Sequence, residues 1–234
     1  MKKVVTMERT KEILDKIEQN KSQFKGEIVY DGIVNLENYL ASPIKILWIL
    51  KEVNSSDSDW DLRDALSDLK NENRGGLKTG WANTFTPIVY TTYGILENVS
   101  WSNMGNYYEN QEMIDVLKNI AYINIKKVPG TSVSNWQEIR DYYIENKQAI
   151  HNQIKLINPD VIIFGNTLEF FDEDFYELFD KFEENKENNS LHIYSNENNL
   201  LLYAYHPNNR KISQKEYCDL IIDSVSNWKK KFNK

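Results

Sequence analysis

Three polar residues of different chemistry, Glu52, Asn124 and His206, each lie at or just beyond the end of a short apolar run. A carboxylate can orient a water molecule, and an imidazole can donate a hydrogen bond to a leaving group. A carboxamide offers both a donor and an acceptor for reading a ligand edge. An acid, an amide and an imidazole together could therefore stabilise opposite charges that develop across a breaking bond.

Several other chemistries lack their minimum parts. The chain has no G-x-G-x-x-G or G-x-x-x-x-G-K-[ST] phosphate loop, no G-x-S-x-G elbow and no H-E-x-x-H pair. Its single cysteine, Cys218, excludes an internal disulfide and a cysteine-built zinc or iron–sulfur site, because these need several thiolates. We therefore expect no cofactor, no metal and no metal cluster.

Four short apolar runs predict the strands that position these residues: Ile44–Leu50, Ile120–Lys126, Asp160–Phe164 and Leu200–Ala204. Segments with helical patterns separate them, and strands alternating with helices indicate an α/β fold. We expect a three-layer α/β/α domain around a four-stranded, mainly parallel sheet, with residues 1–234 forming one domain. Ligands of such sheets bind outside the carboxyl ends of the strands, where Glu52, Asn124 and His206 fall.

Helices are predicted from apolar spacing and from start and stop signals. Ser134 and Gln137 form a capping box that starts a long helix, and Pro159 ends it after Asn158. The helix at 8–24 is expected to pack on the domain as an N-terminal element within residues 1–26. The remaining predicted helices are 61–71, 84–99, 110–118, an acidic helix at 168–182 and a last helix at 217–228 with a basic tail. Trp136 is expected in the core.

Charge limits the partners of the protein. The formal net charge is −7 for 234 residues, the wrong sign for coating nucleic acid through its phosphates. Residues 168–200 carry ten acidic against two basic residues, whereas residues 201–234 carry seven basic against three acidic ones. Any nucleic-acid contact must therefore be local. Since no apolar run approaches the ~20 residues that span a bilayer, and no signal peptide is visible, we expect a cytoplasmic protein without membrane contact.

Four motifs occur in an order that resembles the uracil-DNA glycosylase superfamily: Ile46–Glu52, Ala121–Asn124, Asp160–Gly165 and Ala204–Asn208. The resemblance spans roughly residues 27–228 and implies the fold of that family. It also implies cleavage of the N-glycosidic bond of uracil or another damaged or modified base that is extruded into a pocket. Glu52 would then orient the attacking water, His206 would donate to the leaving base, and Asn124 would read the base edge.

The same resemblance implies DNA, as a single strand or a locally opened duplex, or a nucleoside or nucleotide, as the partner. Trp60, Trp81 and Phe85 are the candidate aromatic platform for the base. The candidate DNA contacts are Lys51, Asn54, Lys126, Asn208, Asn209 and Arg210. Lys127, beside Lys126, is either a phosphate contact or a solvated charge.

Departures from the family pattern leave alternatives open. The Leu50-Lys51-Glu52-Val53-Asn54 stretch lacks the usual glycine and proline, so Val53 rather than Glu52 could hold the water position. His-Pro-Asn-Asn-Arg also replaces the usual His-Pro-Ser turn. One alternative function is a catalytically silent module that binds a base or nucleotide, such as in phage defence. Another is an unrelated α/β interaction protein that docks a partner through residues 168–185.

Overall fold

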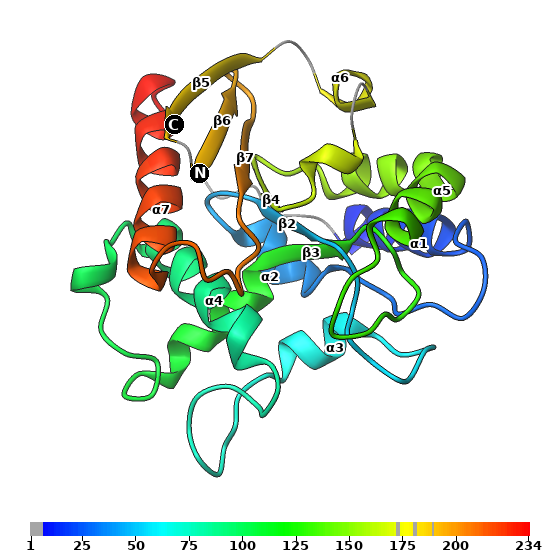
Figure 1. Cartoon of the computed structure of the whole chain (residues 1–234), viewed down its shortest axis with the longest axis horizontal. Helices are drawn as coiled ribbons and strands as arrows, with labels where there is room; N and C mark the ends of the chain where they lie inside the picture. Colours follow the sequence, from blue (N-terminus) through cyan, green and yellow to red (C-terminus); the bar gives the residue numbers. More distant parts are fainter. Residues whose placement is uncertain (1–6, 172–173, 180–181, 189) are drawn as a thin grey trace.

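The computed structural model describes residues 7–171, 174–179, 182–188 and 190–234. Seven strands form one sheet in the order β1-β3-β2-β4-β7-β6-β5 (Figure 1). They are β1 Gly32–Ile33, β2 Ile46–Leu50, β3 Ile120–Asn124, β4 Val161–Gly165, β5 Glu183–Asn188, β6 Leu191–Ser195 and β7 Leu200–Ala204. The four central strands, β3, β2, β4 and β7, are mutually parallel. Strand β1 is antiparallel to β3, β6 is antiparallel to β7, and β5 is antiparallel to β6.

The register of the parallel strands brings their carboxyl ends to one edge of the sheet. Leu50 pairs with Asn124, and Gly165 pairs with Ala204. The segments that follow these strands therefore leave the sheet on the same side. We refer to this side as the carboxyl edge.

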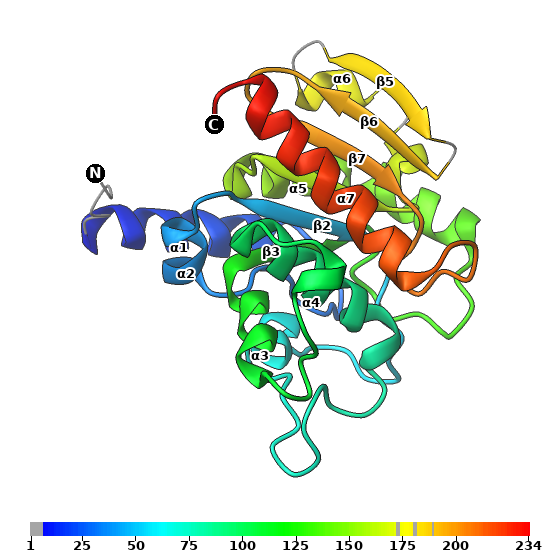
Figure 2. The same cartoon turned by 90° about the vertical axis from the view of Figure 1, so that its left-hand side faces the viewer.

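Helices cover both faces of the sheet. The α-helices are α1 Met7–Lys21, α2 Leu36–Ala41, α3 Leu62–Ser67, α4 Ala82–Glu97, α5 Trp136–Ile157, α6 Phe175–Leu178 and α7 Gln214–Lys231. The 3₁₀ helices include η1 Trp101–Asn103, η2 Gln111–Asn119 and η3 Leu168–Phe170. Helices α4 and α7 pack on one face, and α5 with α1 beside it lies on the other (Figures 1 and 2).

The predicted α/β class and the four predicted strands are confirmed, but the predicted strand number is wrong. The sheet has seven strands rather than four. Strand β1 has two residues and gives no periodic signal. Strands β5 and β6 extend the sheet as a hairpin beyond β7, because pairing with β6 covers the backbone of β7 that would otherwise form an edge.

The long acidic helix predicted at 168–182 does not form in the described part of that segment. Residues 168–170 form η3, residues 175–178 form the single turn α6, and the chain is a strand from Glu183 onward. Phe170 and Phe171 enter the core below α5 instead of lining one helix face. Four residues of the predicted docking segment, 172–173 and 180–181, lie outside the described residues. The interaction-protein alternative therefore loses the helix on which it depended.

The capping prediction for α5 is wrong by one residue. Asn135, not Ser134, caps the helix, since its Oδ1 accepts hydrogen bonds from the backbone N–H groups of Gln137 at 3.0 Å and Glu138 at 3.4 Å. The helix ends at Ile157, where Asn158 adopts a left-handed conformation with φ 49°. No helix in the described residues combines the length and the hydropathy that crossing a bilayer requires.

Candidate functional site

Glu52 leaves the carboxyl end of β2 and forms a buried ion pair. Its Oε2 accepts a hydrogen bond from Lys126 Nζ at 2.8 Å, and Lys126 also contacts Glu138 at 3.3 Å. The Glu52 side chain is only 4 % exposed. It packs directly over Gly130, where a Cβ atom would lie 2.2 Å from the carboxyl carbon. The absence of a side chain at residue 130 therefore makes room for this carboxylate.

Glu52 lines a cleft of about 650 Å³ whose walls are mostly polar. The cleft also contains Glu27, Glu138 and Lys126, together with several hydroxyl groups. Three carboxylates against one ammonium make the cleft unfavourable for a phosphate group. In the described residues, neither Asn124 nor His206 lines it. The cleft thus brings together Glu52 and Lys126 of the predicted site residues and leaves the amide and the imidazole outside.

Asn124, the last residue of β3, is held by its backbone and has a buried, unpaired acceptor on its side chain. Its N–H donates to Asp31 Oδ2 at 2.8 Å. The residue is 1 % exposed, and its Oδ1 accepts no hydrogen bond from the described part of the chain. Strand alternation places Asn124 on the same face as Tyr122, which belongs to the core beneath α4. An unpaired buried acceptor costs about 1–3 kcal/mol, so a ligand donor here would recover free energy.

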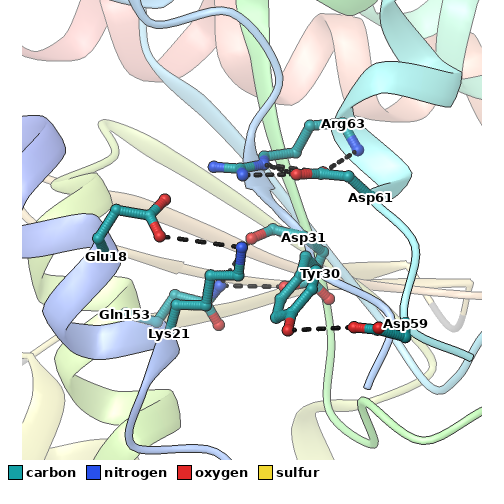
Figure 3. Close-up of polar contacts among 8 residues, drawn as sticks. All are labelled: Glu18, Lys21, Tyr30, Asp31, Asp59, Asp61, Arg63 and Gln153. Carbon is teal, nitrogen blue, oxygen red and sulfur yellow. Dashed lines mark hydrogen bonds and ion pairs between the residues drawn. The ribbon is translucent and has the colours of Figure 1, made fainter. Parts of the chain in front are cut away.

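Asp31 is the centre of a buried network that sequence reasoning missed. Its Oδ1 accepts hydrogen bonds from Lys127 Nζ at 2.6 Å and from Gln153 Nε2 at 3.0 Å. Figure 3 shows Gln153 reaching Asp31 from α5, with the pair of Asp61 and Arg63 nearby. A cavity of about 30 Å³ adjoins the network, which is room for water molecules only.

Lys127 is neither a solvated charge nor a phosphate contact, because its ammonium ends on Asp31 inside the protein. Burial lowers the pKa of Lys127, and the negative charge of Asp31 opposes that change. The sequence signal that could have suggested this pair is weak. Asp31 lies in a Tyr-Asp-Gly stretch that reads as a turn, and only the short antiparallel strand β1 brings it to β3.

His206 lies just past β7 as a neutral imidazole. Burial, with a further contribution from the charge of Lys51, lowers the pKa of His206 to about 4. Its Nδ1 accepts a hydrogen bond from the backbone N–H of Asn208 at 3.1 Å. The neutral ring must therefore carry its proton on Nε2, which can donate to a ligand.

The turn that follows His206 folds back over the sheet edge. A Cβ atom at Gly165 would lie 3.2 Å from Pro207 Cδ and 3.3 Å from Leu50 Cγ. Pro207 thus approaches β4 and β2. The missing side chain at Gly165 allows this close approach of the turn to the carboxyl edge.

Lys51, which directly follows β2, lies near both His206 and Trp136. Burial lowers the pKa of this lysine, and the neighbouring Glu52 opposes the change. Its Nζ lies 4.9 Å from the centroid of the Trp136 ring, a cation–π contact. Among the described residues it forms no ion pair with a carboxylate. Trp136, predicted in the core, is 40 % exposed, because it is the first residue of α5 and packs by only part of its surface.

The aromatic candidates lie on the α4 side of the sheet. Phe85 is buried between Trp81, with ring centroids 5.3 Å apart, and Tyr122, at 5.4 Å. Trp60 is partly buried, and its indole N–H donates to the Asp57 carbonyl at 2.9 Å. These rings share the face of Asn124, but Phe85 has almost no exposed surface for stacking.

The predicted DNA contacts differ in whether their side chains are exposed or already bonded within the protein. Lys126 is held between Glu52 and Glu138, so its charge is already compensated. Asn209 shapes the turn, since its Oδ1 accepts from the backbone N–H groups of Lys211 and Ile212. Asn54, Asn208 and Arg210 are exposed and available to a ligand.

The described residues contain no group of three or more His, Cys, Asp or Glu side chains arranged to hold a metal ion. Comparison of the chain with models of protein families, with curated proteins and with solved structures gave no match. The geometry of the carboxyl edge therefore carries the functional argument.

Proposed function

We propose that the protein is a hydrolase of the uracil-DNA glycosylase type, which cleaves the N-glycosidic bond of an extruded or single-stranded base at the carboxyl edge. The observation that carries this proposal is the hydrogen bond that His206 Nδ1 accepts from the backbone N–H of Asn208 at 3.1 Å. A neutral ring whose Nδ1 is occupied by Asn208 presents its Nε2–H as a donor. A donor of this kind stabilises the negative charge that develops on a departing base.

Asn124 and Glu52 supply the other two roles. The buried, unpaired Oδ1 of Asn124 is an acceptor at the end of β3, suited to an N–H on a base edge. The Glu52 carboxylate would orient water and offset the positive charge of an oxocarbenium-like sugar. Each of the four motifs lies on or just after one of the four parallel strands, which stand in the sheet order β3-β2-β4-β7.

The charge of the chain favours a small or single-stranded substrate. The net charge of −7 and the acidic cleft around Glu52 disfavour a long contact with duplex phosphates. A modified base in a single strand, or in a nucleoside or nucleotide, needs only a local contact.

A catalytically silent base-binding module is the second candidate, and the position of Glu52 favours it. The carboxylate is tied to Lys126 in a cleft that Asn124 and His206 do not line within the described residues. Val53, by contrast, packs against the core on the face of Asn124. If Val53 holds the water position, the site recognises a base without a carboxylate to activate water.

Base release separates the two candidates. Single-stranded and duplex oligonucleotides that carry uracil, hypoxanthine or a bulky modified pyrimidine are incubated with the protein, and alkali then cuts the strand at each abasic site. A hydrolase releases base from at least one substrate, whereas a silent module binds one and releases none.

Variants test the assigned roles in the same assay. Glu52→Gln and His206→Ala should each lower the release rate, by about 100-fold or more if they act as general catalysts. Glu138→Gln is the matched control for Glu52, since it also removes a carboxylate that contacts Lys126. His192→Ala is the control for His206. Unchanged release by Glu52→Gln and His206→Ala would show that the site is assigned wrongly.

A further inference from the structure

Trp136 has features that its expected place in the core does not explain. The indole stacks on Phe170 with ring centroids 4.7 Å apart and an angle of 17° between the ring planes. Phe170 is itself buried, and Arg140 lies over it at 5.8 Å. The tryptophan ring is therefore held in a fixed orientation at the surface while 40 % of the residue stays exposed.

The surroundings of the ring suit an anionic ligand that has an aromatic part. Lys51 Nζ lies 4.9 Å from the indole centroid and has no carboxylate partner among the described residues. A lysine stem is flexible, so the ammonium can move aside and keep its charge near the ring. The indole N–H of Trp136 also donates to no protein atom in the part of the chain that the structure describes. An aromatic platform beside a positively charged side chain is an arrangement that binds single-stranded nucleic acid.

We propose that Trp136 stacks a base of a single-stranded oligonucleotide and that Lys51 neutralises the adjoining phosphate. This inference rests on the proposed function, because it assigns a second base position to the same carboxyl edge. Trp136 packs toward the core beneath α5, whereas Asn124 faces the core beneath α4. The base on Trp136 and the base that Asn124 reads would therefore reach the carboxyl edge from opposite faces of the sheet.

The position of Lys51 connects the two base positions. It follows β2 directly, contacts Trp136 and lies close enough to His206 to act on it electrostatically. A strand that runs from His206 to Trp136 would pass this ammonium. Substrates longer than one nucleotide should consequently bind more tightly than a mononucleotide.

Binding of a fluorescently labelled single strand of about eight nucleotides, measured by anisotropy, tests the inference on the full chain. Trp136→Ala should weaken binding roughly 10-fold, the size expected for losing one base–aromatic stack. Trp136→Phe keeps a ring and should retain most of the affinity. Tyr108→Ala is the matched control, because Tyr108 is 57 % exposed and belongs to the loop that follows η1.

A second measurement tests the role of Lys51. Lys51→Met should reduce the slope of log affinity against log salt by about one, as expected when one phosphate contact is lost. Near-UV circular dichroism of each variant checks that the fold is retained.

The outcomes separate this inference from the proposed function. A wild-type protein that binds the strand, with Trp136→Ala binding equally well or Tyr108→Ala losing as much affinity, overturns the stacking role alone. Tighter binding of a duplex or of a mononucleotide than of the single strand also overturns it. A wild-type protein that binds none of these ligands overturns both proposals.

Discussion

Lys127 Nζ lies 2.6 Å from Asp31 Oδ1, and each side chain is only 1 % exposed. Removing one partner of such a pair leaves a buried charge without compensation. Lys127→Met should therefore lower the free energy of unfolding by about 3–5 kcal/mol, measured by urea denaturation. Lys78→Met, which breaks the exposed pair with Asp68, should change the free energy of unfolding far less, because solvent screens this pair. Equal losses in the two variants would contradict the buried pairing.

The neutral state of His206 predicts a pH dependence of stability. A histidine in the unfolded chain takes up its proton near pH 6.5, whereas burial and the charge of Lys51 lower the pKa of folded His206 to about 4. Between these values the unfolded state binds more protons, so the free energy of unfolding falls as the pH drops from about 6.5 toward 4. His206→Gln should make this fall shallower.

His151 serves as the internal reference for that experiment. Burial also lowers the pKa of His151, and this contribution remains in both proteins. The measurement is a series of urea unfolding curves between pH 7 and pH 4.5, which covers most of the range between the two pKa values of His206. Parallel pH curves for the wild type and His206→Gln would rule out a neutral buried imidazole at residue 206.

Gly130 and Glu52 should be energetically coupled. A methyl group at residue 130 would lie 2.2 Å from the Glu52 carboxyl carbon, so Gly130→Ala should destabilise the fold by about 1–3 kcal/mol. In a Glu52→Ala background the methyl group has room, and the same change should cost much less. A double-mutant cycle measures this difference. Strict additivity of the two single changes would place the carboxylate elsewhere.

The N-cap of α5 can be tested with two adjacent residues. Asn135→Ala removes the acceptor for two backbone N–H groups and should cost about 1 kcal/mol of stability. Ser134→Ala leaves that cap in place and should change stability by only a few tenths of a kcal/mol. A larger loss for Ser134→Ala would restore the capping box that the sequence predicts.

The parallel core of the sheet was predictable because each of its strands is a continuous apolar run. Strand β1 was not, since two residues that include a glycine carry no periodicity. The β5–β6 hairpin was not predicted from the sequence. The acidic residues around Phe179 and Phe182 give a spacing of apolar and polar residues that is typical of an amphipathic helix, although β5 is a strand. The pairing of β6 with β7, a tertiary contact, decides the conformation of the hairpin.

The candidate site shows the same limit. The positions of Glu52, Asn124 and His206 at the carboxyl edge could be predicted, because each residue lies at or just after the end of an apolar strand and these strands are parallel. The direction of each side chain beyond the strand depends on distant partners. Glu52 lies in the polar cleft, where it forms an ion pair with Lys126. No local sequence pattern predicts this pair. The exposure of Trp136 likewise depends on where α5 begins relative to Phe170.

The mixed sheet also has a consequence for the order of folding. Strands β5, β6 and β7 pair with their chain neighbours, so only short loops must close to form this meander. Strand β2 must instead wait for Ile120 and Val161, which are far along the chain from Ile46. Contacts of such long sequence separation form slowly. We therefore expect the meander to assemble early and to template β4, with the carboxyl edge completed last.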